Sequence, residues 1–252
     1  MSLSIVLIGL LVGFLVGLTG VGGATLLTPI LLVLGVNPSI AVGTDLFYNS
    51  ITKFFGIIKH WQQKSINFQL VKYFSMGSVP SAAMAITFLH FYNTQDREAF
   101  IKHTLGYVLI AVSISMLFRI FFDEKMKLNA IQLKAIEEKR VLTVGLGALF
   151  GVIVGMTSIG AGSLFAVAMF YLYRVSAVEL VGTDITHAFI LVTVAGLLNA
   201  SFGNVNYLLA GNLLIGSIPG VLLASGLSTK VPTRSIRTIL GVVILISALE
   251  MI

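Results

Sequence analysis

The chain has 252 residues, of which 57% are hydrophobic and only 10% are charged. A soluble domain of ordinary composition carries about 25% charged residues, so the composition excludes a soluble globular protein. The chain has no cysteine, which excludes disulfides, thiol catalysis and thiolate metal sites. Its net charge of +6 comes from basic residues in loops, which membrane topology explains better than nucleic-acid binding.

Long apolar segments follow one another along the whole chain, and most can cross about 30 Å of hydrocarbon. We expect eight of them, at residues 3–34, 39–59, 67–92, 102–122, 141–173, 176–199, 207–227 and 235–252. In lipid, the backbone must satisfy its own hydrogen bonds, and the alternation of a barrel is absent. The sequence therefore predicts an all-α polytopic membrane protein, with a single transmembrane domain over residues 1–252.

The first and fifth segments are much longer than a single crossing needs, and each is interrupted near its middle, at Thr19–Gly23 and Thr157–Gly162. Each is either one long tilted helix or a re-entrant hairpin of two half-helices. If all eight segments cross, the two sides carry eight and six basic residues, whereas two hairpins change the split to twelve and two. Because lysine and arginine collect in cytoplasmic loops, the hairpins are favoured.

The hairpin interpretation leaves three full transmembrane helices in each half, an odd number, so the two halves have opposite orientations. We therefore expect two inverted repeats, 1–122 and 141–252, each a broken re-entrant hairpin plus three transmembrane helices. A charged cytoplasmic linker, 123–140, joins them, and both termini lie outside. Half-helices of about 15 residues would reach ~22 Å, which brings their tips near the midplane.

Short motifs recur between the halves at one constant offset in the numbering. Val42–Asp45 (VGTD) returns as Val181–Asp184, and the Gly-Ser-x-Pro that ends at Pro80 returns with its end at Pro219. A proline inside a helix removes a hydrogen bond, so Pro80 and Pro219 are predicted kinks or hinges. Paired halves with broken helices are typical of transporters with a central site. Glycines spaced by four are expected only to let helices pack closely: Gly9, Gly13, Gly17, Gly147, Gly151 and Gly155.

The two breaks form the predicted substrate site. Glycine lets a solute approach main-chain N–H groups, and the half-helix that follows offers the partial positive charge of its N-terminus. Such a site suits a small anion, and the alternative is that the glycines only allow close packing or a turn. The residues expected to bind substrate are Thr19, Gly20, Gly22, Gly23, Thr44, Asn49, Thr157, Ser158, Gly160, Gly162, Ser163 and Thr183.

Asp45 and Asp184 are the acidic residues that lie far from the expected membrane ends. An acid inside an apolar segment is costly, so one interpretation is that these two couple transport to a proton or cation. The other is structural, with each acid capping a half-helix or bonding a hairpin tip, and neither is favoured. Lys53 shares a helix face with Asp45, and one interpretation is that it pairs with this acid or attracts the anion; the alternative is that it snorkels to the membrane interface. His187 shares a face with Asp184, and one interpretation is that it titrates near neutrality; the alternative is that it is a hydrogen-bonded packing group.

These motifs resemble those of the sulfite exporter TauE/SafE family of membrane permeases. The resemblance is carried by Gly13–Pro29 (GFLVGLTGVGGATLLTP), Ala41–Asp45 (AVGTD) and the second VGTD, and it covers nearly the whole chain. It implies transport of small anions, often sulfur oxyanions or organosulfonates such as sulfite or sulfoacetate, across a bacterial cytoplasmic (inner) membrane. The second break departs from the first, with Ser158 for Gly20, so an asymmetric pocket is expected.

We therefore predict a secondary transporter for a small anion that works by alternating access around the two breaks. An anion channel and a non-transport membrane scaffold are the alternatives. An intramembrane enzyme is disfavoured, because the sequence has no HExxH motif, no cysteine and no evident Ser–His arrangement. The expected partners are the anion, a coupling proton or cation and the lipid bilayer. No cofactor, metal or nucleic acid is expected. The sequence leaves the oligomeric state open, and a homodimer is one of the alternatives.

Overall fold

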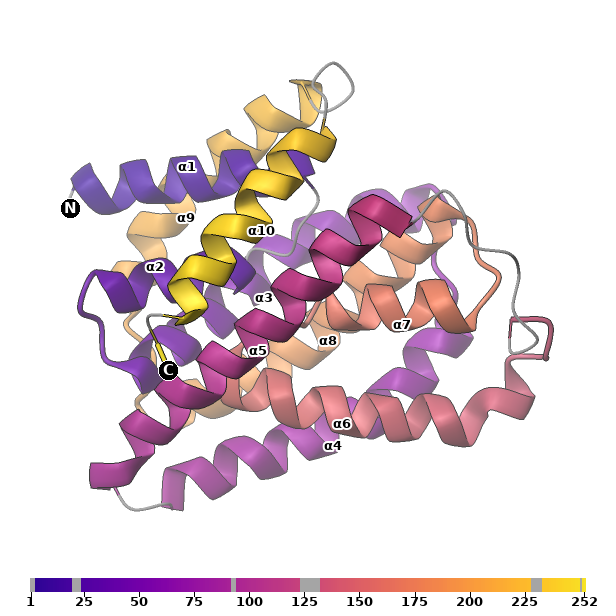
Figure 1. Ribbon diagram of the computed structural model, residues 1–252, viewed down its shortest axis with the longest axis horizontal. Helices are drawn as coiled ribbons and strands as arrows, with labels where there is room; N and C mark the ends of the chain where they lie inside the picture. Colours follow the sequence, from indigo (N-terminus) through magenta and orange to yellow (C-terminus); the bar gives the residue numbers. More distant parts are fainter. Residues whose placement is uncertain (1–2, 20–23, 92–93, 123–131, 228–232, 250) are drawn as a thin grey trace.

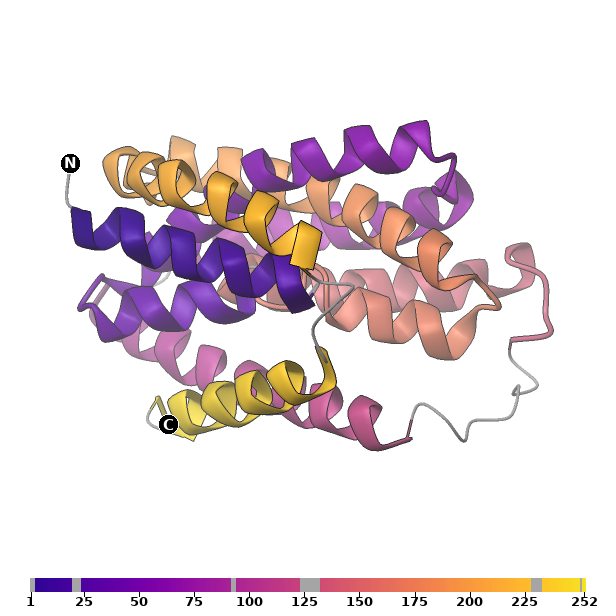
Figure 2. The same cartoon turned by 90° about the horizontal axis from the view of Figure 1, so that it is seen from above.

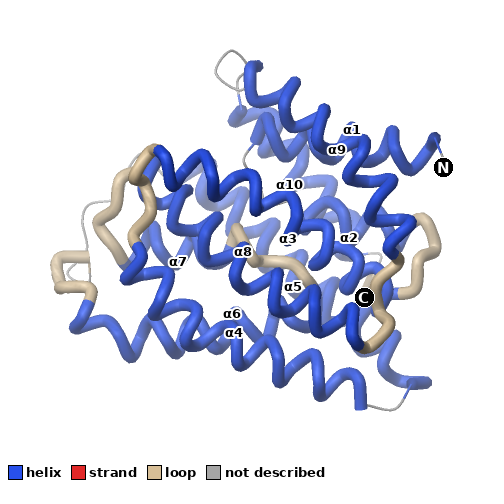
Figure 3. The backbone as a smooth tube through the Cα atoms, turned by 180° about the vertical axis from the view of Figure 1, so that it is seen from behind, coloured by secondary structure: helices blue, strands red, loops and turns tan. Residues whose placement is uncertain are grey.

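The computed structural model describes residues 3–19, 24–91, 94–122, 132–227, 233–249 and 251–252 (Figure 1). Within these ranges all regular structure is helical (Figure 3). The elements are α1 (Leu3–Thr19), α2 (Ala24–Val33), α3 (Pro38–Gln62), α4 (Phe68–Phe91), α5 (Thr94–Phe122), η2 (Glu137–Lys139), α6 (Arg140–Thr157), α7 (Leu164–Leu172), α8 (Ala177–Ser201), α9 (Tyr207–Leu227) and α10 (Thr233–Leu249). The all-helical prediction is confirmed.

Four stretches of the described chain are helical, long and apolar enough to cross a membrane. They are Phe68–Phe91, Glu137–Thr157, Ala177–Ser201 and Tyr207–Ala224. Three of them, in α4, α8 and α9, coincide with expected full spans. The remaining one contains α6, for which the sequence predicts a half-helix of about 15 residues. That length is wrong, because α6 has 18 residues and reaches about 27 Å.

The long first and fifth segments are each interrupted, as expected, and the chain turns back at both places. Figures 1 and 2 show α2 running opposite to α1 and α7 running opposite to α6, with the two pairs entering from opposite ends of the fold. Residues 20–23 of the first break lie outside the described residues. The second lies between Thr157 and Leu164. The arms are unequal, because α7 has only 9 residues.

Asparagine caps set where two of the helices begin. The side chain of Asn67 accepts a hydrogen bond from the amide of Leu70 at 3.2 Å, and that of Asn206 accepts one from Leu209 at 3.0 Å. An asparagine at this position satisfies a backbone donor that the first helical turn leaves unpaired. The two caps fix the starts of α4 and α9, and their own amides reach the duplicated VGTD motifs.

Close helix packing depends on glycine. Helix α1 packs along α9, α4 along α6, α3 along α8 and α5 along α10. A Cβ atom at Gly13 would overlap the backbone of Ser217, and one at Gly151 would overlap the backbone of Ser78. The predicted packing role of the glycines spaced by four is confirmed at these positions, while the surroundings of Gly17 lie outside the described part.

Two further predictions concern the prolines and the linker. Pro80 lies inside α4 and Pro219 inside α9, and both helices continue through them. Neither proline ends its helix, and their role as kinks or hinges stays a prediction. Of the linker 123–140, the part from residue 132 onward is described, and it ends in the short helix η2 before α6.

Candidate functional site

The second break is a turn in which the backbone leaves helical angles. Ser158 has φ +63° and Gly160 has φ +97°, in the left-handed region that glycine adopts easily and serine does not. The hydroxyl of Thr157 serves the turn, since it donates to the carbonyl of Ile153 at 2.7 Å and accepts from the amide of Ile159 at 3.2 Å. The Thr157 side chain thus stabilises the turn through two hydrogen bonds to its backbone. Ser158, the next residue, is fully buried.

Asp45 lies in α3 and is completely buried. Its Oδ2 accepts hydrogen bonds from Thr28 Oγ1 of α2 at 2.5 Å and from Ser158 Oγ at 2.9 Å. Its Oδ1 accepts one from Asn49 Nδ2, one helical turn further on, at 2.6 Å. A buried carboxylate is costly without partners, and here both oxygens have them. These four residues are called the central cluster below.

Thr28 is the member of the central cluster that sequence reasoning missed. Its contact with Asp45 depends on how α2 packs against α3, and the spacing of residues within either helix does not predict that packing. A weak signal exists in α2, an otherwise apolar helix, because Thr25 and Thr28 stand three residues apart and therefore share a face. Both are buried in the structure.

Asp184 has in α8 the position that Asp45 has in α3, but its surroundings differ. It is also buried, with 7% of its surface exposed. Lys53 of α3 interacts electrostatically with both acids. One turn after Asp184 stands Ala188, where α3 has Asn49 as a donor. The two acids therefore share a motif and a cation but not the same hydrogen-bond donors.

The serines of the two Gly-Ser-x-Pro motifs have different partners. Ser78 Oγ and His187 Nε2 lie 2.8 Å apart, and the His187 ring lies 4.1 Å from that of Phe165. Ser217 Oγ instead donates to the carbonyl of Leu214 at 3.5 Å. Tyr48, which is buried, holds in the first half the position that His187 holds in the second. From the sequence the motif is expected only to bend its helix, and the contact of Ser78 with His187 is not foreseen. No local spacing indicates that contact, because the two residues lie on different helices, α4 and α8.

The threonines of the two VGTD motifs hold the starts of other helices. The amide of Asn206 donates to Thr44 Oγ1 at 3.0 Å, and the amide of Asn67 donates to Thr183 Oγ1 at 2.9 Å. Both threonines are fully buried. The threonine of the first motif thus links α3 to the start of α9, and that of the second links α8 to the start of α4. Each motif also places an aspartate in the interior.

Ser163 stands immediately before α7, and its Oγ is buried without a hydrogen-bond partner among the described residues. Gly162 precedes it and is half-buried. Four expected substrate-binding residues of the first break fall outside the described part, either entirely or in their side chains: Thr19, Gly20, Gly22 and Gly23. The described part of the predicted site is therefore centred on the second break.

Apolar helices that turn back at a break, around buried carboxylates and hydroxyls, define a polytopic membrane protein built in the manner of a transporter. The family described as "Sulfite exporter TauE/SafE" matches residues 5–251, and the chain belongs to this family. The resemblance seen in the motifs is thereby confirmed.

Curated relatives agree with this family. The chain is 60% identical over 254 residues to "Probable membrane transporter protein YjnA" of Bacillus subtilis (strain 168), with 100% of both chains covered. It is 23% identical over 266 residues to "Probable membrane transporter protein YunE" of the same strain, covering 98% of this chain and 96% of that one. It is 27% identical over 239 residues to a "Probable membrane transporter protein" of Xylella fastidiosa (strain Temecula1), covering 90% and 83%. No solved structure matches.

The chain is therefore a multi-pass helical membrane protein of a transporter family and not an enzyme.

Proposed function

We propose that the protein is a secondary transporter that carries a small anion across the bacterial cytoplasmic membrane. The substrate class is a sulfur oxyanion or organosulfonate, such as sulfite or sulfoacetate, and transport proceeds by alternating access around the two helix breaks. The family description, which names a sulfite exporter, supports the substrate class. The names of the relatives support transport.

The proposal depends above all on one contact, the hydrogen bond from Ser158 in the second break to Asp45 of the other half. This hydrogen bond makes the break part of a polar site in the interior. A turn that served only to reverse the chain would need no bond to a carboxylate of the other half. Beside it, Ser163 offers a hydroxyl without a partner in the described part, at the N-terminus of α7. A helix N-terminus carries unpaired amides and a partial positive charge, so the hydroxyls and amides there suit an oxyanion.

Coupling follows from competition for the same donors. The carboxylate of Asp45 holds the hydroxyls of Thr28 and Ser158, which a bound oxyanion would use. An ionised carboxylate would also repel that anion at short range. The anion therefore binds when Asp45 is protonated or turned away, and in this proposal a proton accompanies it. Asp184, Lys53 and His187 complete the polar core around this step.

We infer two inverted repeats, 1–122 and 141–252, as the architecture for alternating access. The pairing of α1 with α9 and of α6 with α4 supports them, because the two pairs exchange when each helix is replaced by its counterpart in the other half. The hairpins that enter from opposite ends in Figure 2 support opposite orientations. By the distribution of basic residues, the linker is cytoplasmic and both termini lie outside.

Hydrogen bonds support the same repeats at the level of single residues. The bond from the Asn67 amide to Thr183 has its counterpart in the bond from the Asn206 amide to Thr44. At both ends of the bond, the offset between counterparts equals the offset between the two VGTD motifs. Each bond crosses between the halves. A movement of one part of the protein against the other would therefore act on matched contacts on the two sides of the central cluster.

Uptake and counterflow in proteoliposomes test the proposal, with radiolabelled sulfite, sulfoacetate and sulfate and with or without a pH gradient. We expect saturable flux of a sulfur anion, increased when the proton gradient points in the direction of anion movement. Electrical currents far above the rate of a carrier would instead indicate a channel. Protein that is folded in the liposomes but moves none of these anions would contradict the substrate class.

A further inference from the structure

A pocket lies where the starts of α3 and α5 meet the ends of α4 and α8, apart from the central cluster. Its polar lining consists of Ser39, His90, Arg97, Asn199 and Asn204. Hydrophobic residues line the rest, among them Ile86 and Leu89. None of these polar residues belongs to the predicted substrate site. We propose that this pocket is a second anion-binding site, through which an organic anion such as a short-chain sulfonate reaches the central cluster. The proposal rests on the proposed transport function.

Arg97 supplies the positive charge of the pocket. Its side chain is 17% exposed, and its Nη2 lies 3.4 Å from Glu98 Oε1, at the long limit of a hydrogen bond. The carboxylate of Glu98 is held more closely by Ser39, through the amide at 3.1 Å and the hydroxyl at 2.8 Å. Nε of Arg97 is buried and has no hydrogen-bond partner among the described residues. A guanidinium has five N–H donors, so several are left for a ligand.

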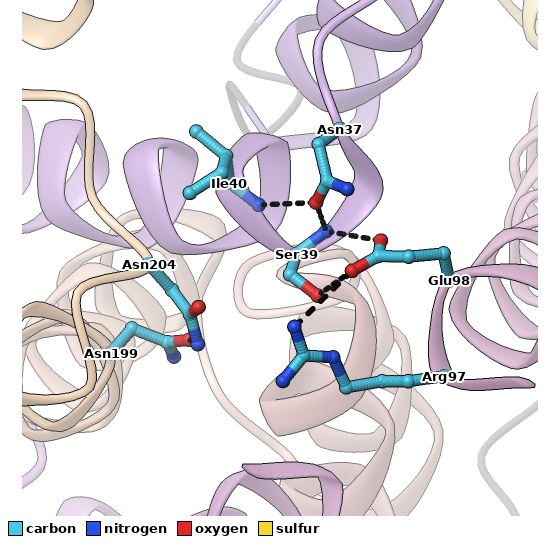
Figure 4. A network of polar contacts seen from close by, with 7 residues as sticks. All are labelled: Asn37, Ser39, Ile40, Arg97, Glu98, Asn199 and Asn204. Atoms are coloured by element: carbon cyan, nitrogen blue, oxygen red, sulfur yellow. Dashed lines mark hydrogen bonds and ion pairs between the residues drawn. The ribbon is translucent and has the colours of Figure 1, made fainter. Parts of the chain in front are cut away.

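Two amide side chains face Arg97 across the pocket. Figure 4 shows the amides of Asn199 and Asn204 on one side and the guanidinium on the other, below Ser39. Nδ2 of Asn204 donates to Oδ1 of Asn199 at 3.4 Å and has a second N–H. A guanidinium fork binds the paired oxygens of a sulfonate or carboxylate, and an amide N–H can donate to the remaining oxygen.

Two residues of the pocket lining stand close in the chain to members of the central cluster. Met156 forms part of its lining and stands two residues before Ser158, the residue of the second break that bonds to Asp45. Val42, also in the lining, stands three residues before Asp45. A cationic pocket raises the local concentration of anions and speeds their arrival. In the proposed orientation this end of α3 faces outside, where basic residues are scarce, so Arg97 is placed to collect the anion there.

Replacement of Arg97 tests this site, with Lys102→Gln as the matched control. Lys102 is an exposed cation of the same helix and is not part of the pocket lining. We expect Arg97→Gln to raise the KM for sulfoacetate uptake about tenfold or more, and Lys102→Gln to change it less than about twofold. Arg97→Lys keeps the charge but loses the fork, and we expect an intermediate KM. Equal KM values for Arg97→Gln and Lys102→Gln would overturn the proposal.

A binding measurement separates this site from the transport function. The shift in Tm of the detergent-solubilised protein with sulfoacetate is measured for the wild type and the three variants. A shift that depends on Arg97 supports the site even if the wild type moves no anion, in which case the proposed function falls alone. Normal uptake by Arg97→Gln, with an unchanged shift, overturns the site and leaves the function. Absence of both uptake and shift in the wild type overturns both. If Arg97→Gln does not fold, the comparison of Arg97→Lys with the wild type decides.

Discussion

Oγ of Ser158 lies 2.9 Å from Oδ2 of Asp45, although the two residues are 113 positions apart in the chain. The contact joins the break after α6 to α3, the helix of the other half that carries the first VGTD motif. It exists because α6 stops in the interior, at a residue whose left-handed backbone turns the chain back. The same feature that interrupts the helix therefore also delivers a hydroxyl to the buried carboxylate.

Replacing Ser158 by alanine removes one of the three side-chain donors to Asp45. Hydrogen bonds to charged groups contribute about 1.5–3 kcal/mol, so we expect a loss of stability in that range if Asp45 is ionised in the resting state. Thermal unfolding of the purified protein in detergent measures it. Ser201→Ala is the matched control, because the exposed hydroxyl of Ser201 bonds only to the carbonyl of Leu198 in its own helix. Equal Tm values for the two variants would mean that the Ser158 bond contributes little.

Asp45→Asn keeps the size of the side chain and removes its ability to bind and release a proton. We expect saturable uptake to continue but to lose its response to a pH gradient, because the competition between carboxylate and anion is gone. Asp184→Asn is the comparison, since Asp184 lacks the donor that Asn49 gives to Asp45. Flux ratios with and without the gradient, measured in the same liposomes, decide. A normal response in Asp45→Asn would assign this residue a structural role.

The sequence predicts the helical class, the two interruptions and the buried acids, because composition, glycine and charge act locally. Which donors meet each acid could not be predicted, since Thr28 and Ser158 reach Asp45 only through the fold. The two arms around the second break are less equal than expected, because α6 has 18 residues and α7 only 9. The end of α6 at Thr157 coincides with the predicted break, whereas apolar residues on either side leave the length of each arm open.

The threonines of the VGTD motifs should contribute equally to stability. Thr44→Val and Thr183→Val each remove the acceptor of one backbone amide at the start of α9 or α4. A polar group left without a partner costs about 1–3 kcal/mol, and we expect a similar fall in Tm for both variants. Thr52→Val is the control, because Thr52 donates only to carbonyls of its own helix. Clearly unequal losses would argue against matched roles in the two halves.

Two glycines of α6 should respond oppositely to the same substitution. A Cβ at Gly151 would overlap the backbone of Ser78, so Gly151→Ala must push α6 away from α4. We expect a loss of about 1–3 kcal/mol, as for other overpacked sites. At Gly145 no atom lies within 4 Å of the added Cβ, and Gly145→Ala should be neutral or stabilise by up to about 1 kcal/mol. Thermal unfolding of both variants measures this, and a stable, active Gly151→Ala would contradict the close approach.

Labelling of single cysteines tests the orientation, and the chain offers a clean background because it has no cysteine. Leu34 is exposed in the loop after α2, and Lys134 is exposed in the linker. Figure 1 places these two stretches at opposite ends of the protein. We expect a membrane-impermeant maleimide to label Leu34→Cys in intact cells and Lys134→Cys only after permeabilisation, because the linker is proposed to be cytoplasmic. The reverse pattern would invert the proposed topology. Labelling of both cysteines from one side would contradict a topology in which these two stretches lie on opposite sides of the membrane.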